Sequence, residues 1–544
     1  MKASLALNKI TAGLALSACL SAAVLSGSSQ TLEGPETSVI LSGANIPAIE
    51  RAVVEAGGEV THRLNIIGAI GASLTKAELE QLRDNPVIQS SFAGGMVDTA
   101  SGNAGGAPGP YAHFPSLVGA DRLHDEGITG ASIGVAIVDS GMQKIAELQK
   151  DTYGVWRTKK YNAIKDVEDS GLDIYGHGTH VASIILNTDY ADDGTMRRNS
   201  IAPDAGAVPV KSFNKRGQGT YANVIRGLDW VLANKDAHNI RVVNLSFSAP
   251  PRSHYWEDPI NQAVMRLWQA GIVVVASAGN TGPDPMTIGV PGNNPYVITV
   301  GAMTDNFTPA DGSDDLLATF SSAGPTYEGF VKPDLVAPGG HMQARSRTSS
   351  YLAETHPEFH DFDKYFTMSG TSQSAAVVSG VVALMLDAKP WLTPDDVKCQ
   401  LVATARTALN DDGTLAYSLF QQGAGVVDAY EAVQSTELGC ANRGLNIDAD
   451  LDDTAHFGGP ANQDQDGNYY IQGMDGYLWA NGEFGTDGYL WANGYLWANG
   501  YLWANGYLWA NGYLWANGYL WANGYLWANG LTETASTNVW VEQE

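Results

Sequence analysis

Apolar runs and amphipathic helical segments alternate between Val118 and about Val433, and this alternation constrains the fold more than any other feature of the chain. The runs typical of buried strands are Ile133–Val138, Ala207–Val210, Val242–Leu245, Ile272–Val275 and Val297–Val300, and the helical stretches are Tyr221–Asn234, Pro259–Ala270 and Ser374–Ala388. Strands that are apolar throughout, rather than at every second residue, are buried on both faces. Because helices lie between or after them, the pattern predicts an α/β domain at 113–438 with a mostly parallel sheet between two helical layers.

A smaller unit at 36–98 precedes this domain. Its expected elements are a strand at 38–42, a helix at 46–56 that Gly57-Gly58 ends, a strand at 64–70 and a short helix at 76–83. A Gly-, Ala- and Pro-rich linker, residues 99–112, joins the two. The pattern therefore predicts a separate small α+β unit, and an independent binding domain is one interpretation of it.

Residues 1–27 have the pattern of an export signal. Lys2 and Lys9 come before an uncharged apolar run at 10–25, which is shorter than the roughly 20 residues of a membrane span. Leu16-Ser17-Ala18-Cys19 resembles a bacterial lipobox, in which Cys19 would be lipidated; the alternative is a small apolar residue inside the signal. The sequence thus predicts a secreted protein, with a lipid anchor at the cell envelope as the second possibility.

Cysteine use and net charge agree with export. Once Cys19 is set aside, Cys399 and Cys440 remain as a pair that an oxidising compartment would join, with two buried free thiols as the alternative. A bridge would close a loop of about 42 residues and add roughly 4 kcal/mol in the chain-entropy model. The formal charge of −27 argues against nucleic acid or an anionic membrane as a partner.

Beyond Cys440 the composition changes. An acidic linker is expected at 439–476, hexapeptide repeats at 477–530 and a polar tail at 531–544. The repeat Tyr-Leu-Trp-Ala-Asn-Gly occurs at 477–482 and in seven tandem copies at 489–530. Asn-Gly turns would suit a meander of short strands, six-residue periodicity would suit a β-helix, and tandem duplication alone would give a low-complexity tail. The aromatic side chains offer contacts to a cell surface or to carbohydrate.

Three short motifs carry candidate chemistry. Asp139 ends a buried strand in Val135-Ala-Ile-Val-Asp139-Ser-Gly, where parallel sheets place functional groups. His177 lies between two glycines that leave room for a substrate backbone, and Ser372 in Ser-Gly370-Thr-Ser372 opens a long apolar helix. Each motif alone has a simpler explanation, such as a helix cap, and His180 lacks the partners of a zinc site.

Together the three motifs are specific. A serine hydroxyl is a weak nucleophile, so it needs an imidazole to take its proton and a carboxylate to orient that imidazole. The sequence therefore predicts Ser372 as nucleophile, His177 as general base and Asp139 as the orienting carboxylate. Their order along the chain, Asp, His and Ser, differs from that of chymotrypsin and of the α/β-hydrolases.

These three segments resemble the signature segments of the subtilisin family over roughly residues 115 to 435. Further matches follow in order: Ile201-Ala-Pro, Val243-Asn-Leu-Ser246, Ala276-Ser-Ala-Gly-Asn280, Phe320-Ser-Ser, Lys332-Pro-Asp-Leu-Val-Ala-Pro338 and Gly425-Val-Val-Asp-Ala429. The resemblance implies a subtilisin-like three-layer domain with serine endopeptidase activity through an acyl-enzyme and no cofactor for the chemistry. It also implies that residues 36–98 are an inhibitory propeptide, removed by autocleavage between about Gly95 and Tyr111, and that the enzyme is a monomer acting on proteins and peptides.

The resemblance extends to the substrate site. It implies Asn280 as the side-chain donor of an oxyanion hole. The implied pocket residues are Ser246, Phe247 and Ser248 on the substrate-pairing strand, Ser277, Ala278 and Gly279 on the opposite wall, and Gly289 at the floor. A roomy pocket for an apolar or aromatic P1 residue (the residue before the cleaved bond) is expected, with a cis bond before Pro291.

The chain departs from the family in several places. Gln373-Ser-Ala-Ala follows the nucleophile where Met-Ala-Thr-Pro is common, and Ser183 and Ser248 stand where glycine is usual, which could narrow the local geometry. Segments 143–173 and 339–363 resemble loop insertions near the active-site rim. Structural Ca²⁺ is one interpretation of Asp166, Asp169, Asp173 and the acidic stretch 448–466, and solvated acidic loops are the other.

Overall fold

The computed structural model describes residues 36–99, 101–103, 113–168, 170–191, 196–306, 308, 312, 314–464, 467–471 and 538–540. The expected export signal with Cys19, most of the linker 99–112, Asp169, the hexapeptide repeats and most of the tail lie outside the described residues. Those expectations stay predictions.

The main body, residues 113–471, is built around one nine-stranded sheet. Its order is β16 (Leu316–Leu317), β15 (Ile298–Thr304), β14 (Val273–Ser277), β12 (Ile240–Leu245), β7 (Gly134–Asp139), β10 (Gly206–Lys211), β8 (Tyr161–Asn162) and β9 (Val167–Glu168), and β17 (Leu335–Pro338) also pairs with β15. All pairs are parallel except those of β16 and β9. Every residue of β7, β14 and β15 is buried, which confirms the mostly parallel sheet expected from the apolar runs.

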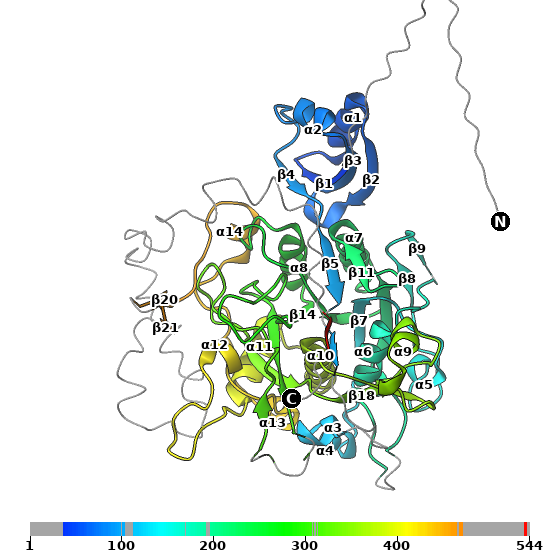
Figure 1. The fold of residues 1–544 in the computed structure, drawn as a ribbon, viewed down its shortest axis with the longest axis vertical. Coiled ribbons are helices and arrows are strands. Elements are labelled where there is room, and N and C mark those ends of the chain that lie inside the picture. The colour runs from blue at the N-terminus through cyan, green and yellow to red at the C-terminus, as the bar shows by residue number, and fades with distance from the viewer. Residues whose placement is uncertain are drawn as a thin grey trace, which may run out of the picture.

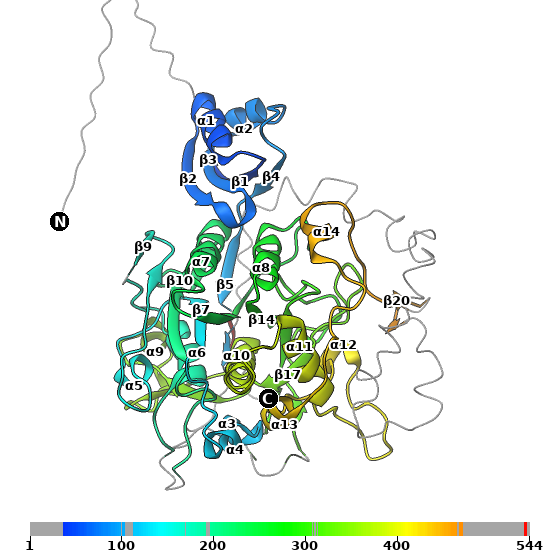
Figure 2. The same ribbon diagram turned by 180° about the vertical axis from the view of Figure 1, so that it is seen from behind.

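Helices cover both faces of this sheet, as Figures 1 and 2 show. On one face lie α6 (His177–Leu186) and α10 (Thr371–Ala388), and on the other lie α7 (Tyr221–Asn234) and α8 (Pro259–Gln269). Within the described part of the chain, α10 alone is long and apolar enough to cross a membrane, with a mean hydropathy of 1.3. It is buried from Thr371 to Leu386 against the sheet and α6, so it is the core helix of the main body.

Shorter elements complete the main body. They are α3 (Phe114–Leu117), α4 (Ala120–Asp125), α5 (Ala146–Gln149), α9 (Tyr351–Thr355), α11 (Pro394–Thr404), α12 (Leu419–Gln422), α13 (Ala429–Gln434), α14 (Ile447–Leu451), the hairpins β18–β19 (Met342–Arg345, Tyr365–Met368) and β20–β21 (Ala461–Gln463, Tyr469–Ile471), and a 3₁₀ turn at Pro357–Phe359. The segment expected as an insertion at 339–363 contains β18, α9 and the 3₁₀ turn, and β19 follows it. Strand β22 (Asn538–Trp540) pairs in parallel with β6 (Ser101–Asn103).

The N-terminal unit is an antiparallel sheet of order β2-β3-β1-β4 with two helices. Its elements are β1 (Thr37–Ser42), α1 (Ile46–Ala56), β2 (Glu59–Leu64), β3 (Ala69–Leu74), α2 (Lys76–Leu82) and β4 (Ser90–Ala93). The single strand expected at 64–70 is wrong. A 3₁₀ turn at Asn65–Ile67 ends at Gly68, whose φ of 62° reverses the chain between two antiparallel strands.

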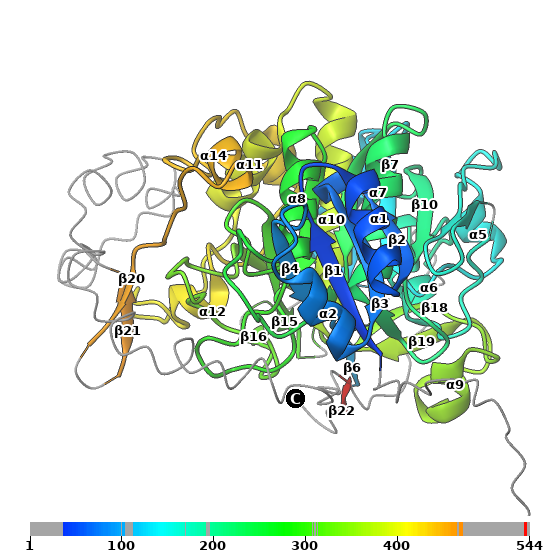
Figure 3. The same cartoon turned by 90° about the horizontal axis from the view of Figure 1, so that it is seen from above.

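The N-terminal unit sits over α7 and α8, as the view from above in Figure 3 shows. The contacts are both apolar and polar: Ile66 and Phe92 belong to the same buried apolar cluster as the main body, and the ring centroids of Phe92 and Tyr221 lie 5.3 Å apart. His62 Nε2 lies 3.1 Å from Asn223 Oδ1, and Arg226 donates to the carbonyl of Thr61 at 2.9 Å. Asp229 accepts hydrogen bonds from the backbone and side-chain nitrogens of Asn65 at 3.2 and 3.0 Å. These bonds fix the unit above the helical layer.

A strand from the N-terminal side enters the main body. Strand β5 (Met96–Thr99) lies between β11 (Gln218–Thr220) and β13 (Phe247–Ser248) and is antiparallel to both. Asp98 is opposite Ser248 and Thr99 is opposite Phe247. The main body therefore holds an extended peptide against residues that the family resemblance assigns to substrate binding.

The stretch expected as an acidic linker is folded in its described part. Asp450, on α14, is buried and accepts hydrogen bonds from the hydroxyls of Tyr255 at 2.9 Å and Tyr296 at 2.6 Å. His456 Nδ1 lies 3.1 Å from Asp450 Oδ1, and its ring stacks on that of Trp256 with centroids 4.4 Å apart. The C-terminal extension of the main body, residues 440–464, is thus hydrogen-bonded to the rest of it through Asp450.

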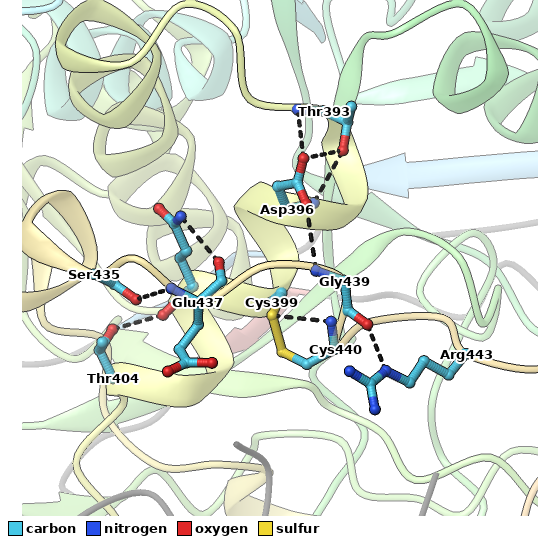
Figure 4. The surroundings of a disulfide bond; sticks show 10 residues. Thr393, Asp396, Cys399, Thr404, Ser435, Glu437, Gly439, Cys440 and Arg443 are labelled. Carbon is cyan, nitrogen blue, oxygen red and sulfur yellow. Dashed lines mark hydrogen bonds between the residues drawn. A yellow bond between two sulfur atoms is a disulfide. The ribbon is translucent and has the colours of Figure 1, made fainter. Parts of the chain in front are cut away.

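A disulfide joins this extension to the main body. Cys399, on α11, is bonded to Cys440, so the bridge expected in an oxidising compartment is confirmed. Figure 4 shows the surroundings: Cys440 N donates to Cys399 Sγ at 3.1 Å, and Gly439 N donates to Asp396 Oδ1 at 3.4 Å. The bridge holds the start of the extension beside α11.

We expect the double substitution Cys399→Ser/Cys440→Ser to lower the free energy of unfolding by about 4 kcal/mol, because the bridge closes a loop of 41 residues in the unfolded chain. The melting temperature of the purified variant, followed by circular dichroism, measures the effect, and reduced wild-type protein should give the same loss. An unchanged melting temperature would show that the bridge adds no net stability.

Candidate active site

Asp139 and His177 form a fully buried pair. Asp139 is the last residue of β7 and His177 is the first residue of α6, so both stand at the carboxyl edge of the sheet. His177 Nδ1 lies 2.9 Å from each carboxylate oxygen of Asp139. Because an ionised carboxylate only accepts, the proton is on Nδ1 and Nε2 is left as the basic nitrogen. Within the described residues, His177 Nε2 has no hydrogen-bond partner.

The glycines beside His177 serve contacts within the chain. A β-carbon built on Gly178 would overlap the carbonyl oxygen of Gly141 and lie 3.0 Å from Asp139 Oδ1. A β-carbon on Gly176, which has a φ of 111°, would lie 2.9 Å from the Ser350 side chain. Gly178 therefore lets α6 approach the Asp139 carboxylate closely, and Gly176 lets the start of α6 approach Ser350. Room for a substrate backbone beside His177 stays a prediction.

Ser372 is the second residue of α10 and is fully buried. Its hydroxyl donates to the carbonyl of Ser246 at 3.0 Å, and the hydroxyl of Ser246 donates to the carbonyl of Ser372 at 2.8 Å. The start of α10 is thus bonded to the strand expected to pair with substrate. The described side chains of Ser372 and His177 share no hydrogen bond, since the Ser372 hydroxyl donates to Ser246 instead. Catalytic hydrogen bonds are often long or poorly aligned before substrate binds.

Asn280 is held beside the nucleophile with its amide nitrogen unpaired. Its Oδ1 accepts from Thr371 N at 3.0 Å and from Thr371 Oγ1 at 2.9 Å. Asn280 Nδ2 is buried and has no partner in the described part of the chain. A buried donor without a partner is costly, and one held a residue from Ser372 suits an oxyanion that forms only during the reaction. Thr371 is a positioning residue that the sequence reasoning missed, since only the fold brings it to Asn280.

Two further polar residues have structural roles. Asp173 accepts from Gly176 N and Thr179 N, each at 2.9 Å, and from Thr179 Oγ1 at 2.6 Å, so it caps the start of α6. His180 is buried with Nε2 near the carbonyls of Met342 and Phe366, and burial, helped by His177, lowers its pKa to about 3. His180 is therefore neutral. Among the described residues, His, Cys, Asp and Glu side chains form no group of three or more able to hold a metal ion.

The seven expected pocket residues come together. Ser277 Oγ donates to the carbonyl of Phe247 at 2.9 Å, which ties one wall to the other, and Gly289 N donates to the carbonyl of Ala278 at 3.0 Å. The Val290–Pro291 bond is cis, as the resemblance implied. A β-carbon built on Gly289 would overlap Ser248 Oγ, so the Ser248 hydroxymethyl group lies against the expected floor, where the sequence suggested that it could narrow the local geometry.

A buried Asp–His pair, a serine at a helix N-terminus and an unpaired amide donor beside it are the parts of a serine hydrolase. The chain belongs to the subtilase family, whose family model matches residues 130–425. It is 36% identical to serine protease AprX of Bacillus subtilis over 389 residues, which covers 70% of this chain and 82% of that protein. It is 32% identical to subtilisin DY of Bacillus licheniformis over 320 residues, or 58% of this chain and 97% of that protein. The protein is a serine-type endopeptidase.

A solved structure shows the same fold. The crystal structure of fervidolysin from Fervidobacterium pennivorans, a keratinolytic enzyme related to subtilisin, matches with a TM-score of 0.58 at 22% identity. The match covers 75% of this chain and 62% of the fervidolysin chain. The subtilisin-like three-layer fold is therefore confirmed.

Proposed function

We propose that this protein is made as an exported zymogen and cleaves internal peptide bonds through an acyl-enzyme on Ser372. The observation that carries the proposal is the buried Asp139–His177 pair, which leaves a basic Nε2 on the side chain expected to serve Ser372. The disulfide Cys399–Cys440 supports an oxidising compartment. The reaction uses side chains of this chain alone.

The chemical steps follow from the geometry. Ser372 Oγ attacks the substrate carbonyl carbon while its proton passes to His177 Nε2, and Asp139 stabilises the imidazolium that forms. The carbonyl oxygen becomes an oxyanion, to which Asn280 Nδ2 donates a hydrogen bond. The amine then leaves with the proton from His177. Water attacks the ester by the same route and releases the acid and Ser372.

The position of β5 supports a propeptide at 36–98 that inhibits the enzyme until it is cut. A substrate would bind as β5 does, as an added strand between β11 and β13. Strand β5 ends at Thr99, opposite Phe247, and the carbonyl of the neighbouring Ser246 accepts a hydrogen bond from Ser372 Oγ. We therefore expect autocleavage shortly after Thr99, which N-terminal sequencing of the mature protein would check.

A fluorophosphonate probe tests the proposed function. We expect the matured wild-type protein to be labelled covalently and the Ser372→Ala variant to remain unlabelled, with the label on the tryptic peptide that contains residue 372. Ser374→Ala is a matched control on the same helix, because the Ser374 hydroxyl donates to the carbonyl of Ala337 and takes no part in the proposed chemistry. Equal labelling of wild type and Ser372→Ala would contradict the proposal.

Docking of the N-terminal unit should weaken as the pH falls. Burial, helped by Arg226, lowers the pKa of His62 in the docked state from its ordinary value near 6.5. The undocked unit therefore binds more protons, and docking loses stability as the pH drops through about 6.5. The test uses the Ser372→Ala chain and compares it with the same chain that also carries His62→Gln. When the pH is lowered from about 7.5 to about 5.5, the backbone amides of β5 should lose more protection from hydrogen exchange in the first chain than in the second, after correction for the pH dependence of the intrinsic exchange rate. Equal losses would contradict the prediction.

A further inference from the structure

The side chain of Ser248 lies at the floor of the expected primary specificity pocket, next to the floor residue Gly289, which has no side chain of its own. Ser248 lies on β13, opposite Asp98 of the inserted strand. A β-carbon built on Gly289 would overlap Ser248 Oγ and lie 3.3 Å from Ser248 Cβ. The space directly above the floor glycine is thus already filled by the hydroxymethyl group of Ser248.

The same hydroxyl also reaches the opposite wall. A β-carbon built on Gly279 would lie 3.1 Å from Ser248 Oγ and 2.8 Å from Ser322 Oγ. Gly279, on one wall, and Gly289, at the floor, are held together by the hydrogen bond from Gly289 N to the carbonyl of Ala278. A hydroxyl that lies against both glycines lies between that wall and the floor, so it reduces the depth of the pocket.

The lining is polar as well as shallow. Ser248 Oγ lies against Gly279, whereas the hydroxyls of Ser277 and Ser322 already have partners, the carbonyl of Phe247 and the backbone nitrogen of Thr281. An aromatic P1 ring pressed into this space would clash with Ser248 and cover its hydroxyl without giving it a hydrogen-bond partner, which costs free energy. An alanine or serine side chain needs no space below Ser248.

We infer that this endopeptidase selects small P1 residues, namely alanine, serine and glycine, and that Ser248 is the residue that excludes large ones. The inference rests on the proposed function and replaces the apolar or aromatic P1 preference expected from the sequence. A single methylene of pocket space is worth 10- to 200-fold in discrimination. The bulk of the Ser248 side chain exceeds that of a methylene, so the effect should be readily measured.

Four tetrapeptide p-nitroanilides that differ only at P1 (Ala, Ser, Leu and Phe) test the inference on the matured full chain. We expect kcat/KM for Ala to exceed that for Phe by at least about tenfold. Ser248→Gly should raise kcat/KM for Phe by about tenfold or more and change that for Ala less than about threefold. Ser183→Gly is the matched control: it makes the same substitution on α6, where Ser183 Oγ accepts from Arg345 N at 2.9 Å, and should leave the Ala-to-Phe ratio unchanged.

The outcomes separate the inference from the proposed function. If the enzyme hydrolyses casein and its kcat/KM for the Phe peptide equals or exceeds that for the Ala peptide, the small-residue preference is wrong, whereas the endopeptidase function stands. An Ala preference that survives Ser248→Gly would overturn the role of Ser248. Failure to hydrolyse casein or any of the four peptides, together with absent fluorophosphonate labelling, would overturn the proposed function itself.

Discussion

Replacing His177 by alanine should lower kcat for peptide hydrolysis by about 10⁶-fold, the size of loss known for the corresponding change in subtilisin, a relative of this protein. Without the imidazole, Ser372 keeps its proton and attacks the substrate carbonyl as a neutral hydroxyl. The three side chains act as a unit, so Ser372→Ala and the double variant should lose as much as His177→Ala and no more. Asp139→Ala should lose less, by a factor of about 10⁴, because the imidazole is still present although poorly oriented.

These variants cannot cut their own chain, so each is matured in trans by affinity-tagged wild-type enzyme that is then removed. Turnover of a p-nitroanilide substrate gives kcat, and circular dichroism shows that the fold is retained. Losses that multiply in the double variant would contradict a single catalytic unit. Full self-processing of His177→Ala would contradict the assignment of His177 as general base.

Replacing Asn280 by alanine should lower kcat by about 10²- to 10³-fold, the loss known for the oxyanion-hole asparagine of subtilisin. We expect KM to stay within a factor of about three, because the lost hydrogen bond forms only in the transition state. Asn280 Nδ2 has no partner among the described residues, so its hydrogen bond is gained only when the oxyanion forms. Loss of such a bond raises the energy of the transition state and spares substrate binding.

Thr371→Val should have a smaller effect than Asn280→Ala and tests whether Thr371 positions the Asn280 amide. It removes the hydroxyl that donates to Asn280 Oδ1 but keeps the backbone donor, so the amide is held less firmly and kcat should fall by less than in Asn280→Ala. Steady-state kinetics on the same substrate separate kcat from KM for both variants. A rise in KM with kcat unchanged would show that Asn280 binds the ground state, and it would contradict the oxyanion role.

Much of the fold could be predicted because each element is fixed by its own residues. The runs at 242–245 and 272–275 are apolar throughout, which suits only strands buried on both faces, and both became central strands of the sheet. The helix at 46–56 begins after Asn45, which caps it, and ends at Gly57 in a left-handed conformation, so both ends follow from local chemistry. The stretch at 64–70 was wrongly predicted as one strand because its apolar residues continue through a 3₁₀ turn. Gly68, which ends the turn, is the one local sign of it in this stretch.

The sequence by itself determined which residues can do the chemistry and in which class of fold. The candidate residues have chemically distinctive side chains and stand next to strand ends or helix starts, and such local patterns can be recognised in the sequence. They are Asp139, His177, Ser372 and Asn280. The tertiary structure decided what surrounds them. Thr371 orients Asn280 across 91 residues of chain, Ser246 and Ser372 are bonded across 126, and the Ser248 hydroxyl covers Gly289. Contacts of this kind exist only once the strands have paired, since sequence distance carries no information about which side chains a parallel sheet brings to one edge. The reaction class could therefore be predicted from the sequence, whereas the contact between the Ser248 hydroxyl and the pocket floor could not.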